Sequence, residues 1–89
     1  MLAPDYTNKF LKDYKQAMKR NYNISLIDAI ITDLIDEKPL AAKHKDHPLA
    51  GNYMGCRECH ILPDWLLIYQ VGNGVIVFER TGTHSDLYR

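Results

Sequence analysis

The chain lacks a net charge and any long apolar run, and each absence excludes a class of protein. Eleven basic and eleven acidic residues cancel among the 89 residues, which argues against a domain that binds polyanions through its overall charge. No apolar run approaches the roughly 20 residues that span a bilayer. The first residues, with Pro4 and Asp5, do not have the basic-then-apolar order of a signal peptide. We therefore expect no membrane partner and a cytoplasmic protein.

Cysteine is also scarce, and both copies fall in one motif, Cys56-Arg57-Glu58-Cys59-His60. C-x-x-C-H is the spacing at which c-type haem is attached, and C-x-x-C suits half a zinc site or a redox pair. However, haem attachment belongs to exported proteins, a zinc site needs about four ligands, and residues three apart on a strand point to opposite faces. We expect two reduced, packed thiols and no haem, metal or other cofactor. A haem or metal protein built on this motif stays the alternative, which an absorption spectrum and a metal analysis decide.

The N-terminal half suits a strand and two helices in a single domain, residues 1–89, whose 46% apolar content supplies a small core. Residues 1–6 fit an edge strand, where Pro4 is tolerated. From Thr7 an amphipathic helix follows, with Phe10, Tyr14 and Ala17 on its apolar face. Its other face is basic: Lys9, Lys12, Lys15, Lys19 and Arg20. A solvated helix face is the plain interpretation of this stripe, and a surface that follows a nucleic-acid backbone is the sharper one.

The second helix is expected to begin at Ser25 as the N-cap and to end before Pro39. Its outer face is acidic, with Asp28, Asp33 and Asp36. The zero net charge therefore conceals a polarised molecule, in which the two helices pack as a hairpin on one face of a sheet.

Three antiparallel strands are expected to follow, over residues 53–61, 65–71 and 75–80. The middle one is apolar at nearly every position, as in a central strand covered on both faces. Gly72-Asn73-Gly74 is a strong hairpin signal between the last two. The sequence therefore predicts an α+β fold in the order β-α-α-β-β-β, with both helices packed on an antiparallel sheet.

Polar residues gather at the ends of these strands. His60 and Asp64 flank a bend set by Pro63, and His60 faces the open side of the sheet if Cys59 faces the helices. A second cluster, which contains Arg80 and His84, follows the last strand, and His47 lies in a loop before the first. Two such clusters at strand ends suggest one site.

These residue types suit the cleavage of RNA by its own 2′-hydroxyl. That reaction needs a base, an acid for the leaving 5′ oxygen and a cation for the charge that develops on the phosphate. Each proton-transfer group contributes roughly 10²–10⁴ in rate, and histidine titrates near neutral pH. Arg80 offers two phosphate oxygens a planar fork. Trp65 and Tyr88 can stack on a base, although a core aromatic is the plainer interpretation of Trp65.

Three spaced motifs, His47-Pro48-Leu49, residues 57–69 and residues 80–88, resemble the YafQ branch of the RelE-like toxins of bacterial type II toxin–antitoxin pairs. The resemblance implies a compact RelE-like α+β fold and a ribosome-dependent endoribonuclease, an mRNA interferase that cuts mRNA in the ribosomal A site and so inhibits translation. It also implies a cognate antitoxin as partner, beside the ribosome and mRNA.

By the same resemblance, the functional positions fall on two sets of residues. The catalytic set is His47, His60, Asp64, Arg80 and His84, and the substrate-binding set is Trp65 and Tyr88. The last position is commonly Phe in this branch, so Tyr88 departs from the pattern. The basic stripe of the first helix becomes the expected ribosome-binding surface.

One alternative stays open at this point, a non-catalytic domain on the same scaffold that binds nucleic acid or protein, because fold does not fix function. It predicts no RNA cleavage even with ribosomes present. The residue types also leave open which group is the base, which is the acid, and which codons are cut.

Overall fold

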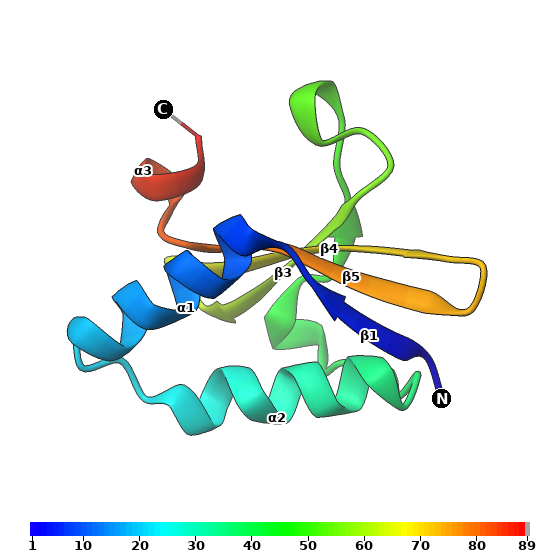
Figure 1. Ribbon diagram of the computed structural model, residues 1–89, viewed down its shortest axis with the longest axis horizontal. Helices are drawn as coiled ribbons and strands as arrows, with labels where there is room; N and C mark the ends of the chain where they lie inside the picture. Colours follow the sequence, from blue (N-terminus) through cyan, green and yellow to red (C-terminus); the bar gives the residue numbers. More distant parts are fainter. Residues whose placement is uncertain (89) are drawn as a thin grey trace.

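A computed structural model, which describes residues 1–88, places five strands in one sheet in the order β1-β5-β4-β3-β2. The elements follow the chain as β1 (Ala3–Tyr6), α1 (Asn8–Lys19), α2 (Ile24–Ile35), η1 (Ala42–His44), β2 (His47–Pro48), η2 (Gly51–Tyr53), β3 (Arg57–Leu62), β4 (Trp65–Gly72), β5 (Val75–Gly82) and α3 (His84–Leu87). Helix α2 lies beneath the sheet and α1 runs along its β5 side, whereas α3 stands on the opposite face (Figure 1). The predicted α+β class is confirmed.

The sheet differs from the prediction in two respects. Strand β1 pairs in parallel with β5, from Ala3 opposite Val75 to Tyr6 opposite Phe78, so that the sheet is mixed and not purely antiparallel. A two-residue strand, β2, adds a fifth member by pairing antiparallel with β3. A strand this short carries no periodic pattern in the sequence, and its pairing is visible only in three dimensions.

Three element boundaries also differ from the sequence prediction. Helix α2 begins two residues early because Asn23 is its N-cap, with a side-chain oxygen that accepts from the Ser25 amide at 3.2 Å. Strand β3 begins at Arg57, since the preceding residues form a 3₁₀ turn and Gly55 has a φ of 91°. The tail folds into α3, a single helical turn that the sequence did not predict.

Two apolar clusters lie on either side of β4. The helix-side cluster joins Phe10 and Ala17 of α1 and Ile27 of α2 to the strands, and the smaller cluster on the opposite face contains Leu66, Ile68 and Leu87. We call this second face the open face. Along the described residues 1–88, no helix is long and apolar enough to cross a bilayer.

The two cysteines lie on opposite faces of the sheet, Cys59 within β3 and Cys56 just before it. Cys59 is fully buried in the helix-side cluster, Cys56 is buried on the open face, and both are free thiols. The two sulfurs therefore do not face a common site, which argues against one haem or metal ion bound by both.

Candidate active site

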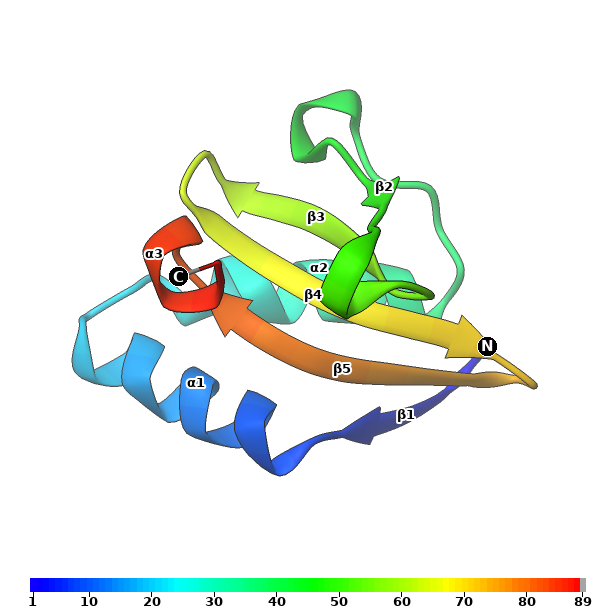
Figure 2. The ribbon, with the colours of Figure 1, turned by 90° about the horizontal axis from the view of Figure 1, so that it is seen from above.

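Strand register brings the predicted site residues onto the open face in two neighbouring rows. His47, Glu58, Ile68 and Arg80 lie opposite one another across β2, β3, β4 and β5, and His60 lies opposite Leu66 in the next row. Because directly opposite residues of antiparallel strands share a face, these side chains leave the sheet on the side of Ile68, away from α2. Seen from above this face, α3 and the segment around η2 stand over the sheet (Figure 2).

His84 and Asp64 form the pair at the end of this face. His84 is the first residue of α3, and Asp64 belongs to the turn that Pro63 sets between β3 and β4. One Asp64 oxygen accepts both the His84 backbone amide at 2.9 Å and the ring Nδ1 at 2.5 Å. The backbone hydrogen bond, followed by the ring hydrogen bond, lowers the pKa of Asp64. The carboxylate thus fixes the ring and directs Nε2 away from the turn.

Glu58 forms a second cluster, which the sequence analysis did not assign to the site. It is only 4% exposed, accepts a hydrogen bond from the Tyr88 hydroxyl, and lies 3.3 Å from His60 Nε2 and 3.7 Å from His47 Nε2. The Glu58 carboxylate is thus a polar neighbour shared by both imidazoles. The signal available in the sequence was the spacing of Glu58 and His60, two apart on one strand and therefore on one face.

The three histidines form a continuous series across the open face. The His60 ring centroid lies 6.3 Å from that of His47 and 5.9 Å from that of His84. His47 donates from Nδ1 to the Lys45 carbonyl at 2.6 Å, which leaves its Nε2 toward Glu58. All three predicted imidazoles are therefore brought together, with a carboxylate beside each of them.

Arg80 is held from behind by a carboxylate of α1. Asp13 accepts from Arg80 Nε at 2.6 Å and from Nη2 at 3.2 Å, and this hydrogen bonding raises the pKa of Arg80. A guanidinium carries five N–H donors, so Nη1 and the second Nη2 hydrogen lie outside this pair. Together they form another two-donor edge, suited to a phosphate.

The two aromatic residues differ in their availability. Trp65 is 2% exposed, donates from Nε1 to the Thr81 hydroxyl at 3.0 Å, and packs edge-on against Tyr22 with centroids 4.8 Å apart. This burial favours the interpretation of Trp65 as a core aromatic, and its stacking on a base stays a prediction. Tyr88 is 44% exposed, and its ring centroid lies 6.4 Å from that of His84. It is therefore placed to contact a substrate.

The basic stripe of α1 is exposed at its four lysines, Lys9, Lys12, Lys15 and Lys19. Arg20 differs, because its Nη1 and Nη2 atoms donate to Asp86 at 2.7 and 3.2 Å. Its charge is thus paired with Asp86 of α3, whereas the lysines present their charges to solvent, and the ribosome-binding role of the stripe stays a prediction.

The fold and this face define a class of protein: a small α+β domain that gathers imidazoles, carboxylates and an arginine on one face of its sheet. Within residues 1–88, no three His, Cys, Asp or Glu side chains are arranged to hold a metal ion. Over residues 2–89 the chain matches the family described as the bacterial toxin of type II toxin–antitoxin systems, YafQ. The chain belongs to this YafQ family, as its motifs predict.

Individual relatives support the same assignment. The mRNA interferase toxin YafQ of Escherichia coli strain K12 is 42% identical over 85 residues, which are 94% of this chain and 92% of that protein. The crystal structure of YafQ from E. coli strain BL21(DE3) has a TM-score of 0.95 at 39% identity, and YafQ in the E. coli DinJ–YafQ complex has 0.93 at 40%, each with full coverage of both chains. The predicted enzyme class, an endoribonuclease of the mRNA interferase type, is confirmed.

Proposed function

We propose that this toxin cuts mRNA in the ribosomal A site by acid/base attack of the 2′-hydroxyl, and that a cognate antitoxin neutralises it. The observation that carries the proposal is the series of three imidazoles on the open face, each with a carboxylate beside it. Arg80 lies on the same face, in the cross-strand row that contains His47. Such groups supply the base, the acid and the cation that the reaction needs.

The proton transfers fall to His60 and His84, whose rings are 5.9 Å apart. One removes the 2′-hydroxyl proton as the O2′–P bond forms, and the other protonates O5′ as the P–O5′ bond breaks. The products are a 2′,3′-cyclic phosphate and a 5′-hydroxyl, and no catalytic metal takes part. Arg80 stabilises the charge on the phosphate through the donor edge that Asp13 leaves free.

The carboxylates orient these groups without exchanging protons with RNA. Asp64 holds His84 at Nδ1 and leaves Nε2 for the substrate. Glu58 lies beside His60 and His47 and holds their rings in place. Tyr88, with its exposed ring, contacts the base next to the cut.

The proposal includes the ribosome because the chain is expected to bind free RNA weakly. Its net charge is zero, so that the long-range attraction typical of basic RNA-binding domains is absent. The four α1 lysines instead give a local basic surface, which docks on ribosomal RNA. DinJ is the antitoxin in the E. coli complex, and we propose that a comparable antitoxin covers this chain with acidic residues that complement the lysines.

Induction in bacteria tests this function. The wild-type chain and His84→Ala are induced without antitoxin while mRNA 5′ ends are mapped. We expect growth arrest and new 5′ ends inside codons for the wild type, and neither for His84→Ala at equal protein level. A harmless wild-type chain, or cleavage that survives His84→Ala unchanged, would contradict the proposal.

A further inference from the structure

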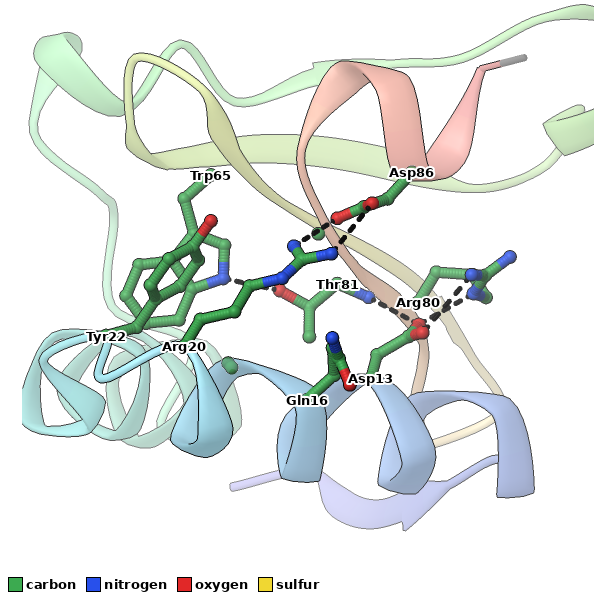
Figure 3. A pocket seen from close by; sticks show the side chains of 10 residues that line it. Asp13, Gln16, Arg20, Tyr22, Trp65, Arg80, Thr81 and Asp86 are labelled. Atoms are coloured by element: carbon green, nitrogen blue, oxygen red, sulfur yellow. Dashed lines mark hydrogen bonds and ion pairs between the residues drawn. The ribbon is translucent and has the colours of Figure 1, made fainter.

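Helix α1 reaches the active face through two ion pairs. Its Asp13 binds Arg80 of β5, and Arg20, which directly follows the helix, binds Asp86 of α3 (Figure 3). Positions seven apart on a helix lie on the same face, about 10 Å apart along the axis. The two side chains therefore form a pair of arms, with a pocket of about 240 Å³ between them.

We propose that Asp13 and Arg20 are positioning residues of the cleavage reaction, by which α1 sets the place of Arg80 relative to His84. The inference rests on the proposed function, in which Arg80 and His84 act on the same phosphate. It also gives Arg20 a role distinct from that of the lysines on the same helix.

The Asp13 arm fixes both the side chain and the backbone of the arginine. Its carboxylate binds Arg80 through Nε and Nη2 and also accepts the Thr81 backbone amide at 3.1 Å. Strand β1 pairs with β5 only as far as Phe78. Beyond that residue, where Arg80 lies, the edge of β5 contacts α1 instead. The guanidinium is held side-on, and its other donor edge keeps a defined direction.

The Arg20 arm fixes the helix that begins at His84. Asp86 accepts from Arg20 and also closes a capping box, in which it accepts the Thr83 amide at 2.9 Å while Thr83 Oγ1 accepts the Asp86 amide at 3.1 Å. Four residues are too few to form a stable helix alone. The position of His84 therefore depends on contacts outside α3, and the two-donor bond from Arg20 to Asp86 is one of them.

Partial burial supports a positioning role for the Asp13 arm, because its two side chains are only 17% and 23% exposed, whereas fully exposed ion pairs hold no fixed geometry. The Arg20–Asp86 pair is more open, at 35% and 25%, and its geometry is defined by the two-donor contact. The Arg20 guanidinium, followed by the Thr83 amide, holds the pKa of Asp86 well below its usual range. The Arg20 arm is thus charged on both sides at every pH at which the ribosome works.

The test replaces each arm and measures cleavage on ribosomes programmed with a defined mRNA. Asp13→Asn keeps the side-chain size and removes one charge, and Arg20→Gln removes one charge and shortens the side chain. Matched controls are Asp28→Asn, which alters a carboxylate that binds Tyr14, and Arg57→Gln, which breaks the ion pair with Asp46. We expect kcat to fall 10- to 100-fold in the first two variants, with KM for ribosomes within twofold, and no change in the controls.

Two further measurements make every outcome decisive. Arg20→Lys keeps the charge but loses the two-donor contact, and its kcat should lie between those of the wild type and Arg20→Gln. If Arg20→Gln does not fold, Arg20→Lys takes its place in the test. NMR signals of the His84 ring should shift in Arg20→Gln, and those of Arg80 Nε in Asp13→Asn. Unchanged kcat in folded variants, or unshifted signals, would overturn the positioning role. Absence of cleavage by the wild type would refute the proposed function, and the NMR signals would still decide the positioning.

Discussion

At the residue scale, Tyr88 is where this chain departs from the Phe expected at the end of the YafQ motif. Its ring is exposed beside His84, while its hydroxyl donates to the buried Glu58. The ring and the hydroxyl therefore have separate tasks, one toward the substrate and one toward the fold.

Tyr88→Phe separates these two tasks. Loss of a hydrogen bond to a buried carboxylate should lower the free energy of unfolding by about 1 to 3 kcal/mol, while the ring that remains should keep cleavage within a fewfold of wild type. Urea unfolding and cleavage of ribosome-bound mRNA measure the two effects. Loss of cleavage at unchanged stability would show that the hydroxyl acts on the substrate.

The cysteines should be inert in the folded protein. Burial raises the pKa of Cys59 to about 12 and also raises that of Cys56, and only a thiolate attacks disulfide reagents. We expect a thiol-specific disulfide reagent to label neither thiol at pH 8 until urea unfolds the chain. Cys59→Ala should retain cleavage, whereas rapid labelling of the folded protein would contradict the packing described above.

The same burial makes stability fall at high pH. The Cys59 thiol is neutral in the folded chain and ionises near pH 8.5 when unfolded, so its contribution is complete below that pH and is lost as pH rises toward 12. Tyr14, whose pKa is raised to about 12 by burial and by its bond to Asp28, adds to the loss above about pH 10. Urea midpoints at pH 7, 9 and 11 should decrease in that order, and less steeply in Cys59→Ala.

At the element scale, the parts of the fold with long periodic patterns could be predicted from the sequence. The two helices and the β3–β4–β5 meander follow from amphipathic spacing and turn residues. Strand β2 and helix α3 could not be predicted, because β2 exists only by pairing with β3, and α3 is closed by a capping box and by Arg20. The direction of β1 relative to β5 has no signal in either segment alone.

The site residues divide in the same way, into those that a sequence pattern indicates and those that only the fold brings together. Motif spacing indicated His47, His60, Asp64, Arg80 and His84, which the fold brings to one region, and their catalytic roles stay predictions. Glu58 and Asp13 were missed because each acts through residues distant in sequence, up to 67 positions away. The motif position of Trp65 gave no indication of its burial, which favours a core role over base stacking.

Gly82 tests how closely α3 must pack on β5. A Cβ at this position would lie 2.9 Å from both Cβ and Oδ2 of Asp86, whereas one at Gly72 of the neighbouring strand would meet nothing within 4 Å. Gly82→Ala should therefore displace α3, cost about 1 to 3 kcal/mol of stability and reduce cleavage at least tenfold. Gly72→Ala is the matched control, and equal activity of the two variants would refute the requirement.

At the scale of the whole molecule, the charges are separated although their sum is zero. The α1 lysines form an exposed basic face, and the acidic residues of α2 lie on a different helix. Such a distribution favours a docking surface of limited area over general attraction to RNA.

Charge reversal of this face should weaken docking and spare the chemistry. Lys12→Glu combined with Lys15→Glu and Lys19→Glu should raise KM for ribosomes at least tenfold, leave kcat and the unfolding midpoint nearly unchanged, and reduce the salt dependence of binding. Lys38→Glu, an exposed lysine beyond α2, is the control. Equal cleavage of free mRNA and ribosome-bound mRNA would contradict ribosome dependence.

The central claim is that the 2′-hydroxyl of the mRNA is the nucleophile and that side chains of the open face move the protons. The most direct measurement compares two mRNAs on the same ribosomes, identical except for one 2′-deoxy nucleotide at the cut. The account predicts a 2′,3′-cyclic phosphate from the all-RNA message and no cut at the deoxy position, at chelator levels that leave the ribosomes intact. Undiminished cleavage of the deoxy message would contradict it.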